Sequence, residues 1–191
     1  MTHFYTRTGD EGYTDLLGGR AAKHAPRPEV IGSLDEASAQ IGFARAVTDL
    51  GRTRDILIAV QRDLYVLMAE LAFTPDMLQQ KFHITAEHVR RIESETDALS
   101  EETPLPPHFI LPGDTLSGAS LDVARTVVRR AERQIVKLVH EEEFNNPQAL
   151  AYLNRLSSLL FILARYEDKQ ADVTPLRAKP DARSLRPHSE D

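Results

Sequence analysis

The chain has 191 residues, of which 41% are hydrophobic, and this suffices for one domain with a sizeable core. Its formal net charge of -6 argues against a general nucleic-acid-binding protein, which would present a basic surface. The sequence contains no cysteine, which excludes disulfides, thiolate metal sites and a cysteine nucleophile. No apolar run approaches the ~18 residues that span a bilayer, and there is no hydrophobic signal region, so we expect a cytoplasmic protein without membrane contact.

The first 28 residues are rich in glycine, threonine and aspartate and show no helical periodicity. Composition alone leaves disorder and a structured loop equally open. Glycines beside hydroxyl groups and basic side chains suit a backbone that wraps phosphates, because glycine lets amide N–H groups approach closely and threonine adds a donor. The spacing matches neither GxxxxGKS/T nor GxGxxG, so a phosphate site here would differ from the standard nucleotide-binding loops.

Helical periodicity and capping signals predict five helices in the remaining chain. Pro28 suits the start of the first helix, Thr85 can cap the third, and Asn146 is a good N-cap followed by Pro147. The helices are placed at about residues 29–47, 54–73, 85–100, between 113 and 138, and 147–168. With little strand signal, the sequence predicts an all-α five-helix bundle over residues 1–168, followed by a mobile or surface-draped polar tail at 169–191.

The fourth helix combines a buried-helix pattern with a high density of arginines. Its apolar residues are spaced three and four apart, as in a helix that packs along a bundle seam: Leu121, Ala124, Val128, Ala131, Ile135 and Leu138. Arg125, Arg129 and Arg133 follow one flank of this seam with Glu132 among them, and Arg130 lies on the opposite side. These arginines would repel one another unless carboxylates of neighbouring helices or a bound phosphate group meet them.

Motifs for other chemistry are absent. The histidines are scattered and form neither HExxH nor a paired Glu-x-x-His arrangement, so no protein-ligated metal is expected. No GxSxG nucleophile motif is present. What remains is positive charge that suits a polyphosphate, which it can hold by bidentate hydrogen bonds while stabilising a leaving group: Arg7, Lys23, Arg125, Arg129, Arg130 and Arg133. In the last helix, Asn154 interrupts the apolar surface and is either a hydrogen-bonded core residue or a ligand contact.

Six blocks of sequence, taken together and in this order, resemble the PduO-type ATP:cob(I)alamin adenosyltransferases. They are TRTGDEGYT at 6–14, Lys23, LDE at 34–36, FILPG at 109–113, ARTVVRRAER at 124–133 and LNRLS at 153–157. The resemblance implies a ferritin-like five-helix homotrimer with active sites between subunits, where ATP and a corrinoid bind side by side. It also implies transfer of the 5′-deoxyadenosyl group of ATP to Co(I) with release of triphosphate, Mg²⁺ beside the ATP, and a reductase and an adenosylcobalamin-dependent mutase as further partners.

The resemblance also assigns roles by motif. Contacts to ATP would come from Thr6, Arg7, Thr8, Gly9, Thr14, Asp15 and Lys23 in the N-terminal segment, and from Arg129, Arg130, Ala131, Glu132, Arg133 and Asn154 on the helices. Phe109 would lie beneath the corrin and displace its lower axial ligand, so that Phe109 and Arg129 would be the catalytic residues. Arg125 would pair with Asp35 of the adjacent subunit.

Some positions depart from the family pattern. Ser38 stands where the usual DELN has asparagine, Ser158 ends the usual NRLSD block, and Asp114 replaces the last glycine of PGG. The segment between Gly19 and Lys23 is also one residue short. With these departures, the resemblance supports ATP binding better than it supports corrinoid turnover. They leave as alternatives a non-catalytic ATP-binding trimer, acting as a sensor or cofactor chaperone, and a purely structural bundle with salt-bridged arginines.

Overall fold

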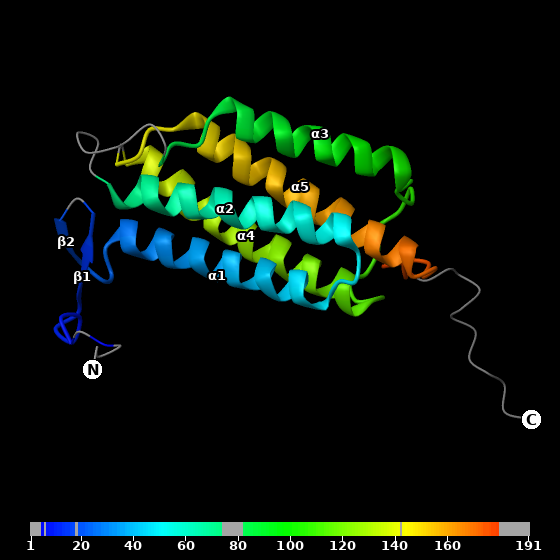
Figure 1. The fold of residues 1–191 in the computed structure, drawn as a ribbon, viewed down its shortest axis with the longest axis horizontal. Coiled ribbons are helices and arrows are strands. Elements are labelled where there is room, and N and C mark those ends of the chain that lie inside the picture. The colour runs from blue at the N-terminus through cyan, green and yellow to red at the C-terminus, as the bar shows by residue number, and fades with distance from the viewer. Residues whose placement is uncertain (1–4, 6, 18, 74–81, 142, 180–191) are drawn as a thin grey trace, which may run out of the picture.

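A computed structural model describes residues 5, 7–17, 19–73, 82–141 and 143–179, and within these ranges five helices lie along one long axis (Figure 1). They are α1 Pro26–Val47, α2 Gly51–Ala72, α3 Ala86–Glu102, α4 Leu116–His140 and α5 Pro147–Gln170. The predicted five-helix bundle is confirmed. The helix starts differ most at α1 and α2, each of which begins three residues earlier than predicted. For α1 the reason is that Pro26 also fits a first helical turn, where no N–H partner is needed.

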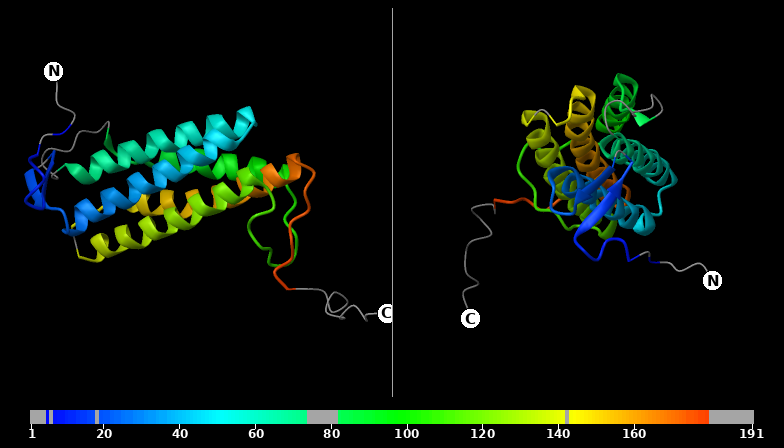
Figure 2. Two further views of the ribbon diagram at one scale, coloured as in Figure 1. Left: turned by 90° about the horizontal axis from the view of Figure 1, so that it is seen from below. Right: turned by 90° about the vertical axis from the view of Figure 1, so that its left-hand side faces the viewer.

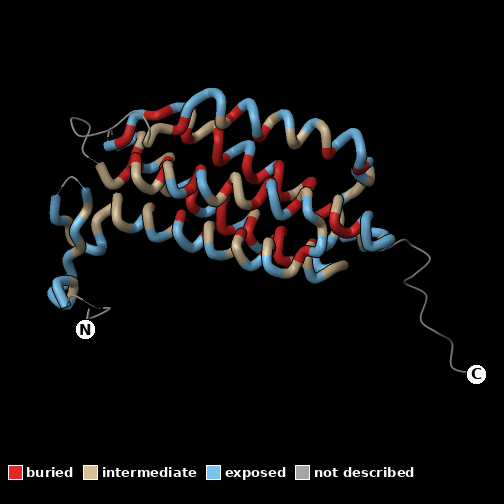
Figure 3. Tube along the Cα trace, in the orientation of Figure 1, coloured by how far each residue is buried: buried red, intermediate tan, exposed pale blue. Residues whose placement is uncertain are grey.

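The helices pack in the spatial order α2, α1, α4, α5, α3, and α4 lies between α1 and α5. Figure 3 shows the buried residues on the inward sides of the helices. The apolar seam predicted for α4 is fully buried from Leu121 to Leu138. Because α4 also carries the arginines, the core fixes the direction in which their side chains leave the bundle.

Two predicted helix caps are present. Asn146 Oδ1 accepts hydrogen bonds from the N–H groups of Gln148 at 2.9 Å and Ala149 at 3.4 Å, with Pro147 as the first helical residue. Thr85 is the N-cap of α3, and its N–H donates to His88 Nδ1 at 3.1 Å. None of the described helices is long and apolar enough to cross a membrane.

The structure adds a β-hairpin within the N-terminal segment. β1 Tyr13–Leu16 pairs antiparallel with β2 Gly19–Ala22, and the register opposes Leu16 to Gly19. Figure 2 shows this hairpin across the end of the bundle where α1 begins. The hairpin was not predicted, because each strand is only four residues long and neither strand alternates apolar with polar residues over a useful length.

The described residues after α5, 171–179, run beside the loop between α3 and α4. In this segment Arg177 forms an antiparallel bridge with Ile110 of the loop. Thus the described part of the predicted polar tail lies against the loop that carries Phe109 (Figure 2).

Candidate active site

The facing sides of α4 and α5 carry three of the six residues predicted to bind ATP from the helices: Arg129, Glu132 and Asn154. The two helices run antiparallel, so residues later in α5 face residues earlier in α4. Asn154 Nδ2 donates to Glu132 Oε1 at 3.1 Å, and two turns away the Arg125 guanidinium lies 6.0 Å from the centroid of the Phe161 ring. Asn154 is exposed, so it is not a buried core asparagine. Its exposure excludes the hydrogen-bonded core residue, and the contact of Asn154 with a ligand stays a prediction.

A cavity of about 390 Å³ opens beside these contacts, between α3, α4 and α5. Its lining combines two guanidinium groups with hydroxyl and apolar side chains: Thr96, Ser100, Leu105, Arg125, Arg129, Ser157, Ser158, Phe161 and Ile162. The sequence analysis did not propose Phe161 as a site residue, because a phenylalanine at helical spacing indicates core. Such a lining can hold an anionic group against the arginines and an apolar surface against Phe161.

The predicted division of the arginines is confirmed by their contacts. Arg129 lines the cavity on the α5 side of α4, whereas Arg130 points to the opposite side and forms an ion pair with Glu36 of α1. Arg129, Arg130 and Arg133 are all exposed. The carboxylate of Glu36 therefore meets Arg130, and the guanidinium group of Arg129 stays directed at the cavity.

The N-terminal segment forms its own folded unit around Lys23. Lys23 Nζ donates to the Gly9 carbonyl oxygen at 2.8 Å, and Arg20 donates to the Thr8 carbonyl oxygen at 3.2 Å. A Cβ atom on Gly9 would lie 2.9 Å from Lys23 Nζ, so glycine permits this close approach. Thr14 and Asp15 lie on β1. The predicted contact at Thr6 lies outside the described residues.

Phe109 is at the other end of the bundle. Its side chain is 90% exposed and belongs to the loop between α3 and α4, whereas the hairpin lies where α1 begins (Figure 1). One chain therefore brings together the α4 and α5 residues, and separately Gly9 with Lys23, but it does not bring Phe109 to the N-terminal segment.

The sequence matches the family described as cobalamin adenosyltransferase over residues 4–167. The chain belongs to this family. The corrinoid adenosyltransferases of Bacillus subtilis and Citrobacter freundii are 36% and 39% identical, over 88% and 91% of this chain and 88% and 99% of their own. Two solved structures of a PduO-type adenosyltransferase from Lactobacillus reuteri superpose with TM-scores of 0.84 and 0.85 at 31% identity. They cover 92% and 93% of this chain and all of theirs; one is an arginine-to-lysine variant complexed with ATP, and the other a phenylalanine-to-alanine variant complexed with cobalamin and ATP.

In this cobalamin adenosyltransferase family member, Arg125 has a partner in its own chain. Arg125 Nε donates to Asp122 Oδ1 at 2.9 Å, and Asp35 is exposed on α1. The pairing of Arg125 with Asp35 of another subunit stays a prediction. Asp122 is buried, so it fixes one side of the Arg125 guanidinium group whatever the other side contacts.

Asp122 is part of a buried ion cluster that the sequence analysis missed. Its Oδ2 accepts from Arg165 at 2.9 Å, and Arg165 also lies 2.9 Å from Asp168 Oδ2. Arg165 and Asp168 are 3% and 0% exposed. Burial raises the pKa of Asp168, while the hydrogen bond from Thr115 and the charge of Arg165 act in the opposite direction. The only sequence signal for this cluster is that Asp122, Arg165 and Asp168 adjoin apolar seam positions.

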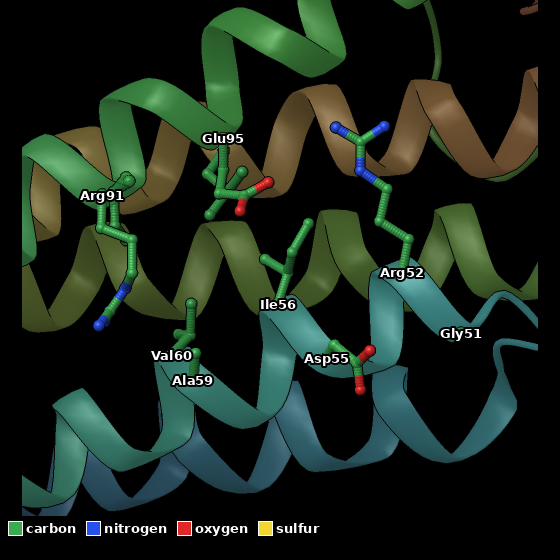
Figure 4. Close-up of a pocket in the computed structure, with 10 residues that line it drawn as sticks. Gly51, Arg52, Asp55, Ile56, Ala59, Val60, Arg91 and Glu95 are labelled. Atoms are coloured by element: carbon green, nitrogen blue, oxygen red, sulfur yellow. The ribbon is translucent and has the colours of Figure 1, made fainter.

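A second cavity, of about 570 Å³, lies between α2 and α3, and Leu159 of α5 also lines it (Figure 4). None of the predicted site residues lines it. Its two arginines are engaged within the bundle, since Arg52 contacts Glu102 at 2.5 Å and Arg91 pairs with the buried Asp63. We therefore place the candidate active site at the α4–α5 cavity.

Proposed function

We propose that this protein is a corrinoid adenosyltransferase that transfers the 5′-deoxyadenosyl group of ATP to Co(I) of a corrinoid. The observation that carries the proposal is the α4–α5 face of a member of this family, where Arg125, Arg129 and Phe161 line one cavity. The hydrogen bond between Asn154 and Glu132 lies on the same face. In the reaction a cobalt–carbon bond forms, the bond between C5′ and its oxygen breaks, and triphosphate leaves with the electron pair. Reduced cobalt is the nucleophile, which agrees with a sequence that contains no cysteine and no GxSxG nucleophile motif.

The protein's part in this chemistry is binding and charge stabilisation. Arg129 and the neighbouring arginines would hold the triphosphate by bidentate hydrogen bonds and stabilise the charge that develops on it. Lys23 and the backbone around Gly9 would bind phosphates and nucleoside. The described residues contain no group of three potential metal ligands among His, Cys, Asp and Glu, so a Mg²⁺ ion would be held chiefly by phosphate oxygens, with Glu132 as the nearby carboxylate.

The two Lactobacillus reuteri structures support the roles of Arg129 and Phe109. The arginine and the phenylalanine changed in those variants are as far apart along their chain as Arg129 and Phe109 are along this one. Phe109 is exposed, as expected of a ring that meets a large ligand instead of a core. The proposed arrangement places this ring against the lower face of the corrin.

The proposal includes a homotrimer with sites between subunits. An exposed face formed by α1 and α4 supports this part of the proposal. The ion pair of Glu36 with Arg130 lies on this face. Phe43 lies two turns after Glu36 on α1, and Val123 lies two turns before Arg130 on α4. Because α1 and α4 run antiparallel, both residues lie on this face. Their side chains are 51% and 49% exposed, and a second copy of the chain would cover them.

An anaerobic assay with ATP and chemically reduced cob(I)alamin tests the activity. We expect loss of the Co(I) absorbance, appearance of adenosylcobalamin and release of one triphosphate per product. The same assay would detect the non-catalytic alternative, since a sensor or chaperone would bind ATP without forming the cobalt–carbon bond. A reductase that supplies Co(I), a mutase that receives the product, and the reducing cytoplasm as the location complete the proposal.

A further inference from the structure

Phe109 is the most exposed large hydrophobic residue in the described part of the chain. Its ring is 90% exposed, so packing within the described chain does little to fix where it points. The position of the ring therefore depends on whatever fixes the main chain of the loop between α3 and α4, which we call the Phe109 loop (residues 103–115).

The segment that follows α5 supplies this support. The Ala178 N–H donates to the Phe109 carbonyl oxygen at 2.9 Å, and the Leu111 N–H donates to the Leu176 carbonyl oxygen at 2.8 Å. These two bonds flank the antiparallel bridge between Ile110 and Arg177. Figure 2 shows the two stretches side by side at the end of the bundle. Residues 175–179, the clamp segment, thus pair with the backbone that carries Phe109.

Asp114 adds a third bond. Gly113 has φ +121°, a conformation that favours glycine, and the turn there places Asp114 beside the clamp segment. Asp114 Oδ2 accepts a hydrogen bond from the Leu176 N–H at 3.3 Å. The departure from the family pattern at this position therefore provides an acceptor for the clamp, besides adding a negative charge.

The clamp and the loop share an anchor at the end of α5. Thr115 Oγ1 donates to Asp168 Oδ1 at 2.7 Å, and the Val173 N–H donates to the Asp168 carbonyl oxygen at 2.9 Å. A Cβ atom on Gly118 would lie 2.4 Å from Asp168 Oδ1, so glycine at this position leaves room for the hydrogen bond between Thr115 and Asp168. The buried Asp168 therefore fixes both the start of α4 and the chain that leads into the clamp.

We propose that the clamp segment and Asp114 position Phe109 for the corrinoid and thereby act on the cobalt half of the reaction. This inference rests on the proposed function. The clamp residues are positioning residues, whereas Phe109 is the side chain that meets the corrin. Because the residues proposed for ATP lie on α4, α5 and the N-terminal segment, loss of the clamp should leave ATP affinity intact.

Two truncations of the full chain test the proposal. A chain that ends at Thr174 loses the clamp but keeps the Val173–Asp168 bond, and a matched control ends at Lys179 and keeps the clamp. We expect the shorter chain to lose at least tenfold in turnover from Co(II) corrinoid with a mild reductant, with an ATP Kd within twofold of wild type, and the control to keep the wild-type rate. Equal rates in the two chains, or a loss of ATP binding as large as the loss of turnover, would overturn it.

Chymotrypsin cleavage after Phe109 gives a readout that needs no activity. Without the clamp the exposed loop should be cut at least fivefold faster than in the control chain, at equal thermal stability. Asp114→Ala should shift cleavage in the same direction by less, and Asp114→Asn, which keeps an acceptor, should stay near wild type. Equal cleavage of the two truncated chains refutes the clamp, whether or not the wild type forms adenosylcobalamin, so this failure is distinct from failure of the proposed function.

A double variant separates positioning from general damage. In a Phe109→Ala background there is no ring left to position, so removal of the clamp should change turnover by less than twofold. A further tenfold loss in that background would mean that the clamp acts on something other than Phe109.

Discussion

Arg129 is exposed on α4 at the edge of the cavity, so its side chain can be removed without leaving a buried charge unpaired. A charge-assisted contact to triphosphate is worth about 1.5–3 kcal/mol, which corresponds to a factor of ten or more. We predict that Arg129→Ala weakens ATP binding or turnover at least tenfold while circular dichroism shows an intact bundle. Lys137→Ala, which removes another exposed cation of α4, is the matched control. Unchanged kinetics in folded Arg129→Ala would remove this residue from the site.

The Phe109 ring should affect the reduction of the corrinoid and not the binding of ATP. An apolar ring on the lower face of the corrin excludes the axial ligand and stabilises four-coordinate Co(II), which is easier to reduce. We predict that Phe109→Ala strongly lowers turnover from Co(II) corrinoid, keeps ATP affinity within a few fold, and is partly rescued by pre-reduced Co(I). The role assigned to Phe109 fails if wild-type spectra with ATP and Co(II) corrinoid contain no four-coordinate species, or if the variant loses ATP binding.

Tyr152 is fully buried, and its hydroxyl group donates to Asp63 Oδ2 at 2.8 Å. Burial, and then the negative charge of Asp63, raise the pKa of Tyr152 well above 10. An unfolded tyrosine ionises near pH 10, so the unfolded state loses this proton first. The contribution of Tyr152 to stability is therefore complete below about pH 10 and is lost as the pH rises toward its raised pKa.

An ultraviolet titration of the chain's five tyrosines checks this. Tyr152 should ionise only together with the loss of helical circular dichroism, and Tyr152→Phe should remove that last phenolate step. Ionisation of all five tyrosines near pH 10 in a folded bundle would contradict the prediction.

At the scale of elements, the start of α5 joins three parts of the fold. Besides capping α5, Asn146 Nδ2 donates to Glu70 Oε1 at 2.7 Å and to the Ile84 carbonyl oxygen at 3.0 Å. Loss of the cap costs about 0.5–2 kcal/mol, and a buried acceptor without its donor costs about 1–3 kcal/mol more. Asn146→Ala should therefore lower the free energy of unfolding, measured by urea denaturation, by about 1.5–5 kcal/mol. The exposed neighbour offers the control Asn145→Ala, and equal stability of the two variants would mean that the Asn146 contacts contribute nothing.

The helices could be predicted because each is specified locally. The α4 seam repeats apolar residues over about five turns, and Thr85 and Asn146 mark helix starts by their own side chains. The hairpin could not be predicted, since its strands are short. Its pairing also depends on hydrogen bonds that Lys23 donates to the Gly9 and Gly12 carbonyl groups. The antiparallel bridge of Arg177 with Ile110 joins segments 67 residues apart in a stretch with few apolar residues, so periodicity carries no sign of it.

The candidate site was predictable in part for the same reason. Arg125 and Arg129 lie on one flank of a regular helix, so helical geometry alone places them together. The ion cluster of Asp122, Arg165 and Asp168 is different, because charged residues on a helix ordinarily face solvent and only tertiary packing buries these three.

At the scale of the molecule, one chain holds its proposed ATP and corrinoid residues in separate places. The hairpin and Phe109 occupy opposite ends of the bundle (Figure 1), and the arginines lie between them on α4. A site that uses the hairpin, Phe109 and the arginines of α4 is not complete within the described part of one chain. This separation is the structural reason to expect that activity depends on assembly.

The pairing of Asp35 with Arg125 across subunits tests that expectation. Arg125 already contacts Asp122 in its own chain, so a second carboxylate would complete its contacts in a partly buried interface, where an unpaired charge costs more than at the surface. We predict that Asp35→Asn and Arg125→Ala each reduce activity, and that the double variant loses less than the sum of the two in free energy. Asp49→Asn, a change at an exposed carboxylate in the loop between α1 and α2, should have no effect. Light scattering should give the mass of a trimer for the wild type, and additive losses or a monomeric mass would exclude the proposed interface.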